Sequence, residues 1–251
     1  MLGRALSSVF SNPTVSLASL GPAVADPPWS RGRARLALTA FAAGALLVGC
    51  GRSAKVVSTS TLTRPQLEEN AARGDAQAQT LLGKIYLEGP RSEQTQAVRY
   101  FEAAAGQGVV EAHYYLGMMA EAGRGLPRND TNALQWYRKA AEGGHRDAQY
   151  SLAVMYATGR GTERQKEESV KWFRAAAEQG LAEAQFNLGQ RYQFGQGVPT
   201  NLVEAYKWFA IAGKQGIADA KQTMTQLRPL LSSQQIREAE AAAAVFQPRT
   251  K

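Results

Sequence analysis

Residues 182–216 read AEAQFNLGQRYQFGQGVPTNLVEAYKWFAIAGKQG, and most of this pattern recurs upstream at an interval of 36 residues. The interval separates the tryptophans Trp136, Trp172 and Trp208 and the paired glycines that begin at Gly123, Gly159 and Gly195. A more degenerate copy begins at Ala78, 34 residues before Ala112. Recurrence at a period of this length predicts an array of structural repeats.

Each copy of the pattern predicts two helices. Ala148, Leu152 and Tyr156 recur every four residues, which places them on one face of a first helix. The glycine pair then ends this helix, because glycine adopts the left-handed conformation at low cost. Asn129 and Asn201 precede the second helices of two copies and are suitable N-caps. No strand-like alternation of useful length is present, so the sequence predicts an all-α protein.

The recurring motifs A-Q-x-x-L-G, G-x-G-V-P and A-x-x-W-[FY]-x-x-A-A-x-x-G resemble the Sel1-like repeat, a relative of the tetratricopeptide repeat. Residues 184–189, residues 195–199 and the pair Trp208-Phe209 carry the resemblance most closely. The resemblance implies a right-handed α-solenoid with four repeats of about 36 residues over residues 75–216. It also implies that the inner surface of the solenoid binds protein segments.

Shorter helices are expected at both ends of the array. Residues 63–74 predict an N-terminal capping helix, and residues 217–227 supply one more first helix. Ser232 and Gln235 form a capping box for a final helix that ends near Phe246. Residues 217–251 therefore predict C-terminal capping helices and a tail, which cover the otherwise exposed end of the solenoid.

The N-terminal region has the features of an export signal. Arg31, Arg33 and Arg35 precede fourteen uncharged residues, Leu36 to Gly49. Fourteen helical residues span roughly 21 Å, short of the roughly 30 Å hydrocarbon core of a membrane. Residues 1–49 are therefore expected to form a signal peptide. Residues 1–30 contain four prolines and fit a mis-assigned extension ahead of it.

The signal ends in Leu47-Val48-Gly49-Cys50, which resembles the bacterial lipobox. The resemblance implies that Cys50 carries lipid and becomes the first residue of the mature protein, with residues 50–62 as a flexible tether. Gly51, where an aspartate often signals retention in the inner membrane, favours the outer membrane facing the periplasm. A buried apolar helix with an unrelated cysteine remains the alternative, and it would make the chain a cytoplasmic adaptor.

No motif for catalysis, for a cofactor or for a metal is present in the sequence. One cysteine excludes an internal disulfide framework and multi-cysteine metal sites. His113 occupies a repeat position that is otherwise glutamine, and His145 directly precedes a helix. We therefore expect no enzymatic activity. The alternative is a cell-envelope enzyme related to β-lactam or peptidoglycan chemistry, since some relatives with paired cysteines have been linked to β-lactam binding.

The charge also argues against nucleic-acid binding. The formal net charge is +8, of which +3 lies in residues 1–49. The remaining charges are interspersed along the array, without a basic run interleaved with aromatic residues. Other proteins, among them envelope components, are the expected partners, and the oligomeric state is left open.

Twelve positions of the first helices vary between repeats and share one helical stripe, which we call the first-helix stripe. Its members are Leu81, Tyr115, Ser151 and Asn187; Lys84, Met118, Val154 and Gln190; and Glu88, Ala122, Thr158 and Phe194. If first helices line the inner surface, then Tyr115, Met118, Gln190 and Phe194 contact a partner. The alternative is that these four residues pack against neighbouring repeats.

Overall fold

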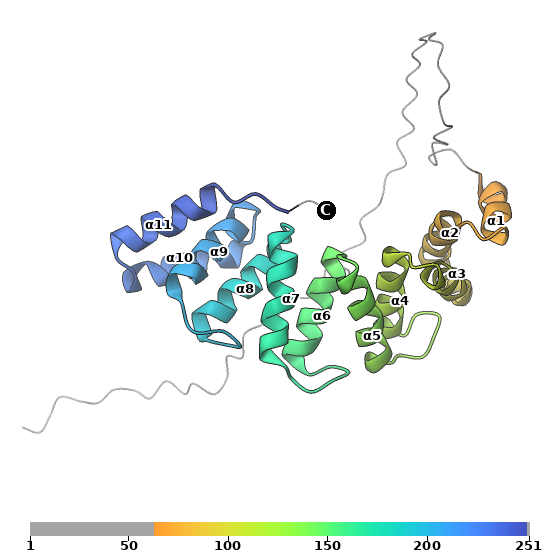
Figure 1. Cartoon of the computed structure of the whole chain (residues 1–251), viewed down its shortest axis with the longest axis horizontal. Helices are drawn as coiled ribbons and strands as arrows, with labels where there is room; N and C mark the ends of the chain where they lie inside the picture. The colour runs from red at the N-terminus through yellow and green to blue at the C-terminus, as the bar shows by residue number, and fades with distance from the viewer. Residues whose placement is uncertain (1–62, 250–251) are drawn as a thin grey trace, which may run out of the picture.

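The computed structural model describes residues 63–249, which form helices joined by turns and short loops (Figure 1). The first helices of the repeats are α2 (Ala76–Glu88), α4 (Val110–Ala122), α6 (Arg146–Thr158) and α8 (Ala182–Phe194). The second helices are α3 (Gln94–Gly106), α5 (Asp130–Glu142), α7 (Lys166–Glu178) and α9 (Leu202–Lys214). α1 (Arg64–Ala72) precedes them, and α10 (Ala218–Leu227) and α11 (Ser233–Ala244) follow, with the 3-10 helices η3 (Arg91–Glu93) and η4 (Arg228–Leu230). The predicted all-helical repeat fold is confirmed.

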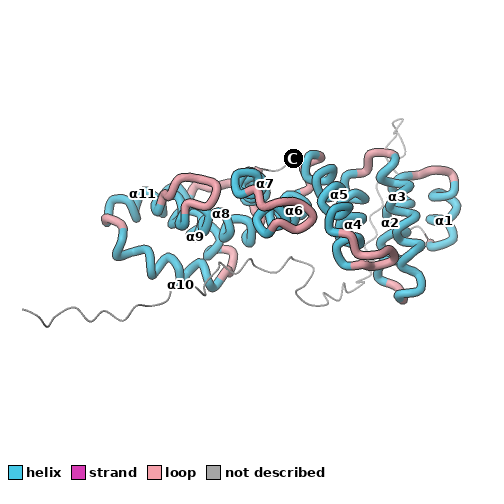
Figure 2. The backbone as a smooth tube through the Cα atoms, turned by 90° about the horizontal axis from the view of Figure 1, so that it is seen from below, coloured by secondary structure: helices cyan, strands magenta, loops and turns pink. Residues whose placement is uncertain are grey.

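The helices pack in chain order as a solenoid. Each first helix packs against the second helix of its own repeat, and each second helix packs against the first helix of the next repeat. Figure 1 shows the array arching from α1 at one end to α11 at the other. Figure 2 shows the same elongated array from below, with loops at the ends of the helices.

The helix ends follow the predicted signals. Gly123, Gly159 and Gly195 end α4, α6 and α8 in the left-handed conformation, with φ of 64°, 76° and 64°. The side chains of Asn129 and Asn201 accept hydrogen bonds from backbone N–H groups in the first turns of α5 and α9. The first repeat differs because its loop is shorter. There α2 ends at Gly89 with φ of −74°, followed by η3.

The second glycine of each pair sets the contact between successive repeats. Gly125, Gly161 and Gly197 have positive φ, and each lies against the backbone that begins the preceding second helix. A Cβ atom would overlap with backbone atoms of Gln94, Asp130 and Lys166, respectively. Only glycine satisfies both constraints at these positions.

Small residues on the first helices receive aromatic rings from the second helices. A Cβ atom on Gly83, Gly117 or Gly189 would lie 2.6 to 2.7 Å from the ring of Phe101, Tyr137 or Phe209, respectively. All three rings are fully buried. Ala140, Ala176 and Ala212 of the second helices are also fully buried, so close helix approach is built into the alanine-rich composition.

Three repeats share a buried glutamine link at the turns. Gln79, Gln149 and Gln185 each donate to a carbonyl near the end of the preceding helix, α1, α5 or α7; these carbonyls belong to Ala71, Ala141 and Ala177, at 3.1 to 3.2 Å. Each also accepts from a second glutamine that follows its own second helix: Gln107, Gln179 and Gln215, at 2.7 to 2.8 Å. The second repeat has His113 and Gly143 at these two positions, so it lacks this link.

The C-terminal end of the array is covered by α11, which packs against α9. Trp208, Ala210 and Ile211 of α9 are buried, whereas all three earlier repeats have a charged residue at the position of Ala210: Glu102, Arg138 and Arg174. Ser232 and Gln235 form the predicted capping box at the start of α11. After α11 the chain turns back along the array, and the backbone N–H of Arg249 donates to the carbonyl of Glu178 at 2.8 Å.

Candidate partner-binding surface

The structure buries four of the twelve positions of the first-helix stripe. Ser151, Asn187 and Val154 are all at most 5% exposed. Glu88 and Phe194, at the C-terminal ends of α2 and α8, are exposed. The two exposed positions of the stripe therefore lie next to the loops that follow the first helices.

Tyr115 and Met118 are engaged in packing. The ring of Tyr115 stacks on Phe101 with centroids 4.8 Å apart, and the ammonium of Lys84 lies 5.5 Å from its centroid. Burial raises the pKa of Tyr115 to about 12. Met118 is 8% exposed and belongs to the core formed by the first three repeats. These contacts accord with the packing alternative for both residues, and partner contact through them stays a prediction.

Gln190 and Phe194 lie on the last turns of α8. Gln190 is half-buried, and Phe194 is 55% exposed. Within residues 63–249, four large apolar side chains are exposed: Phe194, Ile85, Leu230 and Val245. An exposed phenylalanine beside an amide side chain has the chemistry of a protein contact, with an apolar ring and a hydrogen-bonding group.

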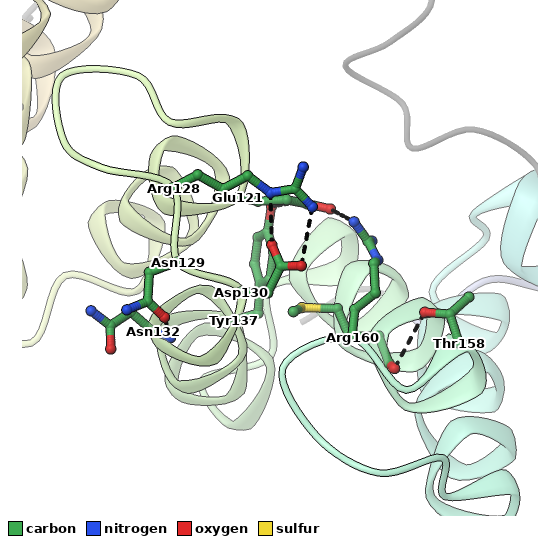
Figure 3. A network of polar contacts seen from close by, with 9 residues as sticks. Glu121, Arg128, Asn129, Asp130, Asn132, Tyr137, Thr158 and Arg160 are labelled. Carbon is green, nitrogen blue, oxygen red and sulfur yellow. Dashed lines mark hydrogen bonds and ion pairs between the residues drawn. The ribbon is translucent and has the colours of Figure 1, made fainter.

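A polar network joins the second and third repeats and was not predicted from the sequence (Figure 3). The carboxylate of Glu121 accepts a hydrogen bond from the hydroxyl of Tyr137 at 2.7 Å and pairs with Arg160 at 2.6 Å. Arg160 comes from the loop between α6 and α7, so the network crosses the boundary between repeats. The Glu121 side chain is 4% exposed. Burial, followed by the charge of Glu121, raises the pKa of Tyr137 well above its ordinary value.

Arg160 and its counterpart Arg124 act in the same way. Each is the middle residue of a glycine pair and reaches back to the first helix of the preceding repeat. Arg124 donates to the carbonyl of Leu87 at 2.8 Å, and Leu87 occupies the position of Glu121. The network therefore links consecutive repeats.

Arg191 is a buried cation in α8. It is 6% exposed, its Nε has no hydrogen-bond partner, and its guanidinium lies 5.4 Å from the ring centroid of Phe173. It donates to the side chain of Gln196. Burial lowers its pKa. Met119 and Met155 occupy the equivalent positions, so Arg191 fills a place where the other repeats have an apolar side chain.

Both histidines are engaged in packing and hydrogen bonding within the repeats. His113 Nδ1 lies 3.1 Å from the carbonyl of Val109, and its ring packs beside Trp136. His145 stacks on Tyr114, with ring centroids 4.3 Å apart, and its Nδ1 accepts from the N–H of Ala148 at 3.3 Å as the N-cap of α6. Burial lowers the pKa of both histidines. Among residues 63–249, no group of three His, Cys, Asp or Glu side chains is placed to hold a metal ion.

Cys50 and the predicted signal lie outside the described residues. Within the described part of the chain, no helix combines the length and the apolar character needed to span a membrane.

A model of the Sel1 repeat matches the chain four times, over residues 76–109, 110–145, 146–181 and 182–217. These matches cover α2 to α9, one helix pair each. No curated protein matches the chain.

The chain is similar to several solved structures, among them the following two. The first is a protective antigen present in uropathogenic Escherichia coli strains, described as displaying an SLR fold, at 39% identity and a TM-score of 0.64. That match covers 66% of this chain and 36% of the antigen, so the chain spans about a third of the antigen's length. The second is a Sel1 repeat protein from Oxalobacter formigenes, at 25% identity and a TM-score of 0.62, with 73% of this chain and 80% of that protein covered.

Proposed function

Because the chain belongs to the Sel1 repeat family, we propose that it is a protein-interaction scaffold of the bacterial cell envelope, held at a membrane by lipid on Cys50. Sel1 repeats form helical scaffolds typical of protein-interaction adaptors. The observation that carries the proposal is the repeated array itself, whose buried positions recur while its accessible positions differ in chemistry from repeat to repeat. Such a surface suits recognition of protein segments.

The end of α8 is the part of the first-helix stripe that best supports partner contact. Phe194 supplies an exposed ring, and Gln190 lies one turn before it. We expect Phe194→Ala to reduce recovery of cross-linked partners from cells without unfolding the array. Thr158→Ala, at the equivalent position of the third repeat, is the matched control. Equal recovery with native protein and with Phe194→Ala would contradict this assignment.

Lipid attachment at Cys50 explains how a chain with a short apolar signal stays in the envelope. Each buried methylene contributes about 0.8 kcal/mol to membrane binding, and more than one acyl chain gives stable attachment. We place the protein at the outer membrane, facing the periplasm. Cells grown with labelled palmitate should label the native protein but not Cys50→Ser. An unlabelled native protein that stays in the cytoplasm would instead support the cytoplasmic adaptor.

The proposed scaffold has no catalytic role of its own. The competing envelope enzyme is tested by adding β-lactam and peptidoglycan substrates to the purified protein, and turnover of either would refute the scaffold-only assignment. Relatives linked to β-lactam binding have paired cysteines in each repeat, whereas this chain has a single cysteine.

A further inference from the structure

The C-terminal tail, residues 245–249, is non-helical and lies over one repeat boundary, and Figure 1 shows it running from the end of α11 toward α7. The ring of Phe246 meets the indole of Trp208 edge-on, with centroids 5.7 Å apart. Pro248 lies over Gly180, where an added Cβ would be 3.1 Å from the proline ring. Arg249 pairs with the carboxylate of Glu178 at 2.9 Å, and its N–H donates to the carbonyl of the same residue. We call Trp208, Gly180 and Glu178 the tail site.

The tail site combines three features that an extended segment recognises. An indole on a second helix receives an aromatic side chain. A glycine with φ of 88° at the end of the preceding second helix offers a surface without a side chain. The last residue of that helix supplies both a carboxylate and a carbonyl, which bind the guanidinium and the N–H of one arginine.

The same three features recur one repeat earlier. Counting back 36 residues from the tail site gives Trp172, Gly144 and Glu142. Gly144 has φ of 89°, matching Gly180. Lysine ammonium groups flank both indoles at similar distances, Lys171 at 5.2 Å from Trp172 and Lys207 at 5.1 Å from Trp208. The next repeat back has Gly106 in place of the glutamate, so it lacks the carboxylate.

The groups of the earlier copy remain accessible. Trp172 is half-buried, whereas Trp208, under Phe246, is 6% exposed. Glu142 is exposed, and it forms no ion pair with the residues that the structure describes. Its carbonyl accepts no backbone hydrogen bond from residues 63–249, unlike that of Glu178. The tail ends its described path at Glu178 on α7, the helix that also carries Trp172, so the two sites are consecutive along the array.

We propose that Trp172, Gly144 and Glu142 bind an extended segment of a partner protein that carries an aromatic residue followed, two and three residues later, by proline and arginine. The tail presents this chemistry to the tail site as Phe246, Pro248 and Arg249. The occupant is a partner rather than a second copy of this chain, because each tail is already held near its own site at a high effective concentration. This proposal rests on the proposed scaffold function and specifies the class of ligand that the scaffold binds, an extended protein segment.

The test uses the purified chain and a fluorescent peptide of residues 243–249, AAVFQPR, amidated at its end. The native chain should bind one peptide saturably. Glu142→Lys should weaken binding at least about tenfold, which corresponds to about 1.4 kcal/mol. Glu163→Lys makes the same charge change on an exposed loop residue and should leave binding unchanged. A peptide with glutamate in place of the arginine should bind the native chain weakly and regain affinity for Glu142→Lys.

Two further variants locate the bound peptide. Trp172→Phe identifies the indole N–H signal of Trp172 by its loss from an NMR spectrum, and this signal should shift when peptide is added to the native chain. Phe246→Ala frees the tail site, so this variant should bind two peptides.

The inference is overturned if the native chain binds no peptide, if binding survives Glu142→Lys unchanged, or if only Phe246→Ala binds and does so at one site. A native dimer that Phe246→Ala dissolves would assign the site to a second copy and overturn the partner. All of these measurements use purified protein, so they are separate from the cellular tests of anchoring and partner recovery. Failure here leaves the envelope scaffold standing.

Discussion

The second repeat and the other three repeats place their buried polar links at opposite ends of the helix pair. The first, third and fourth repeats join consecutive turns through paired glutamines, such as Gln149 and Gln179. The second repeat lacks this pair and instead has Glu121 bound to Tyr137 and Arg160 near the glycine loops. A repeat in this array therefore tolerates loss of one link where another fastens it to its neighbour.

The comparison also shows what each link requires of the residues around it. Gly143 leaves no room for a side chain, because an added Cβ would lie 2.6 Å from Val110. The repeats with glutamine at this position have Ala76, Arg146 and Ala182 where the second repeat has Val110. Packing and hydrogen bonding have thus changed together in the second repeat.

The largest effect is expected for Glu121→Leu, which puts the residue of the first repeat, Leu87, into the second. The change leaves the Tyr137 hydroxyl buried without its acceptor and removes the partner of Arg160. Loss of one member of a buried pair costs several kcal/mol, and Arg160 is one-third exposed, so we expect a loss of about 2–4 kcal/mol. Urea unfolding followed by circular dichroism measures the free energy of unfolding.

Tyr137→Phe provides the control, since the other repeats have phenylalanine at this position. The double variant Glu121→Leu/Tyr137→Phe recreates the chemistry of the first repeat and should recover much of the lost stability. A double variant no more stable than Glu121→Leu alone would show that the hydroxyl is not the source of the loss.

We expect Arg191→Met to stabilise the protein. The variant tests whether a buried charge without a charged partner, Arg191, costs stability, in contrast to Glu121, which has one. Glu121 has Arg160 as a charged partner, whereas Arg191 is only 6% exposed and its Nε has no hydrogen-bond partner. Methionine stands at the two preceding equivalent positions, so the site accommodates its shape. We expect a gain of about 1–2 kcal/mol in the free energy of unfolding. A lower urea midpoint for this variant would mean that Arg191 contributes net stability.

Introducing the paired glutamines into the second repeat would give all four repeats the same buried hydrogen-bonded link. The variant His113→Gln/Gly143→Gln/Val110→Ala supplies both glutamines and clears the space that Val110 fills. One added buried link should contribute about 1 kcal/mol. Gly143→Gln alone should destabilise, because its Cβ overlaps with Val110. Equal stability of the single and triple variants would rule out the predicted coupling.

The smallest effect concerns pH, because both histidines belong to the second repeat. Burial lowers the pKa of His113 and of His145, so the unfolded chain binds more protons than the folded chain below the ordinary histidine pKa of about 6.5. Stability is therefore complete above this value and declines as the pH falls toward the folded pKa values.

His145→Asn keeps an N-cap acceptor that does not titrate, so this variant should lose less stability than the native chain between pH 7.5 and pH 5.5. Urea midpoints at the two pH values measure the difference. An identical pH dependence in the native chain and the variant would exclude His145 as its source.

Local signals in the sequence were enough to predict the helix pairs and their ends. Asn129, Asn201 and the box at Ser232 act at one helix terminus each, and they cap the helices that were expected. The first-helix stripe shows where such reasoning stops. Helical spacing identifies a face but not how closely neighbouring helices cover it, so burial of Ser151 and Asn187 was missed.

Comparison between repeats held further information. Glu121 stands where the first and third repeats have Leu87 and Ala157, and Arg191 stands where the second and third repeats have Met119 and Met155. A charge where neighbouring repeats have an apolar residue indicates burial, although the partner of Glu121 depends on a loop from the next repeat. Lipid attachment at Cys50 lies outside the described residues and stays a prediction.

Gly125, Gly161 and Gly197 approach the preceding second helix so closely that an insertion or deletion must keep them in register. Each glycine meets the same backbone element, so removal of residues 146–181 would bring Gly197 to Asp130, which Gly161 contacts now. A deletion of 35 or 37 residues would instead place a side chain into that backbone contact. Insertion or loss of a whole 36-residue segment therefore preserves this glycine contact, so the array can change in length by complete repeats.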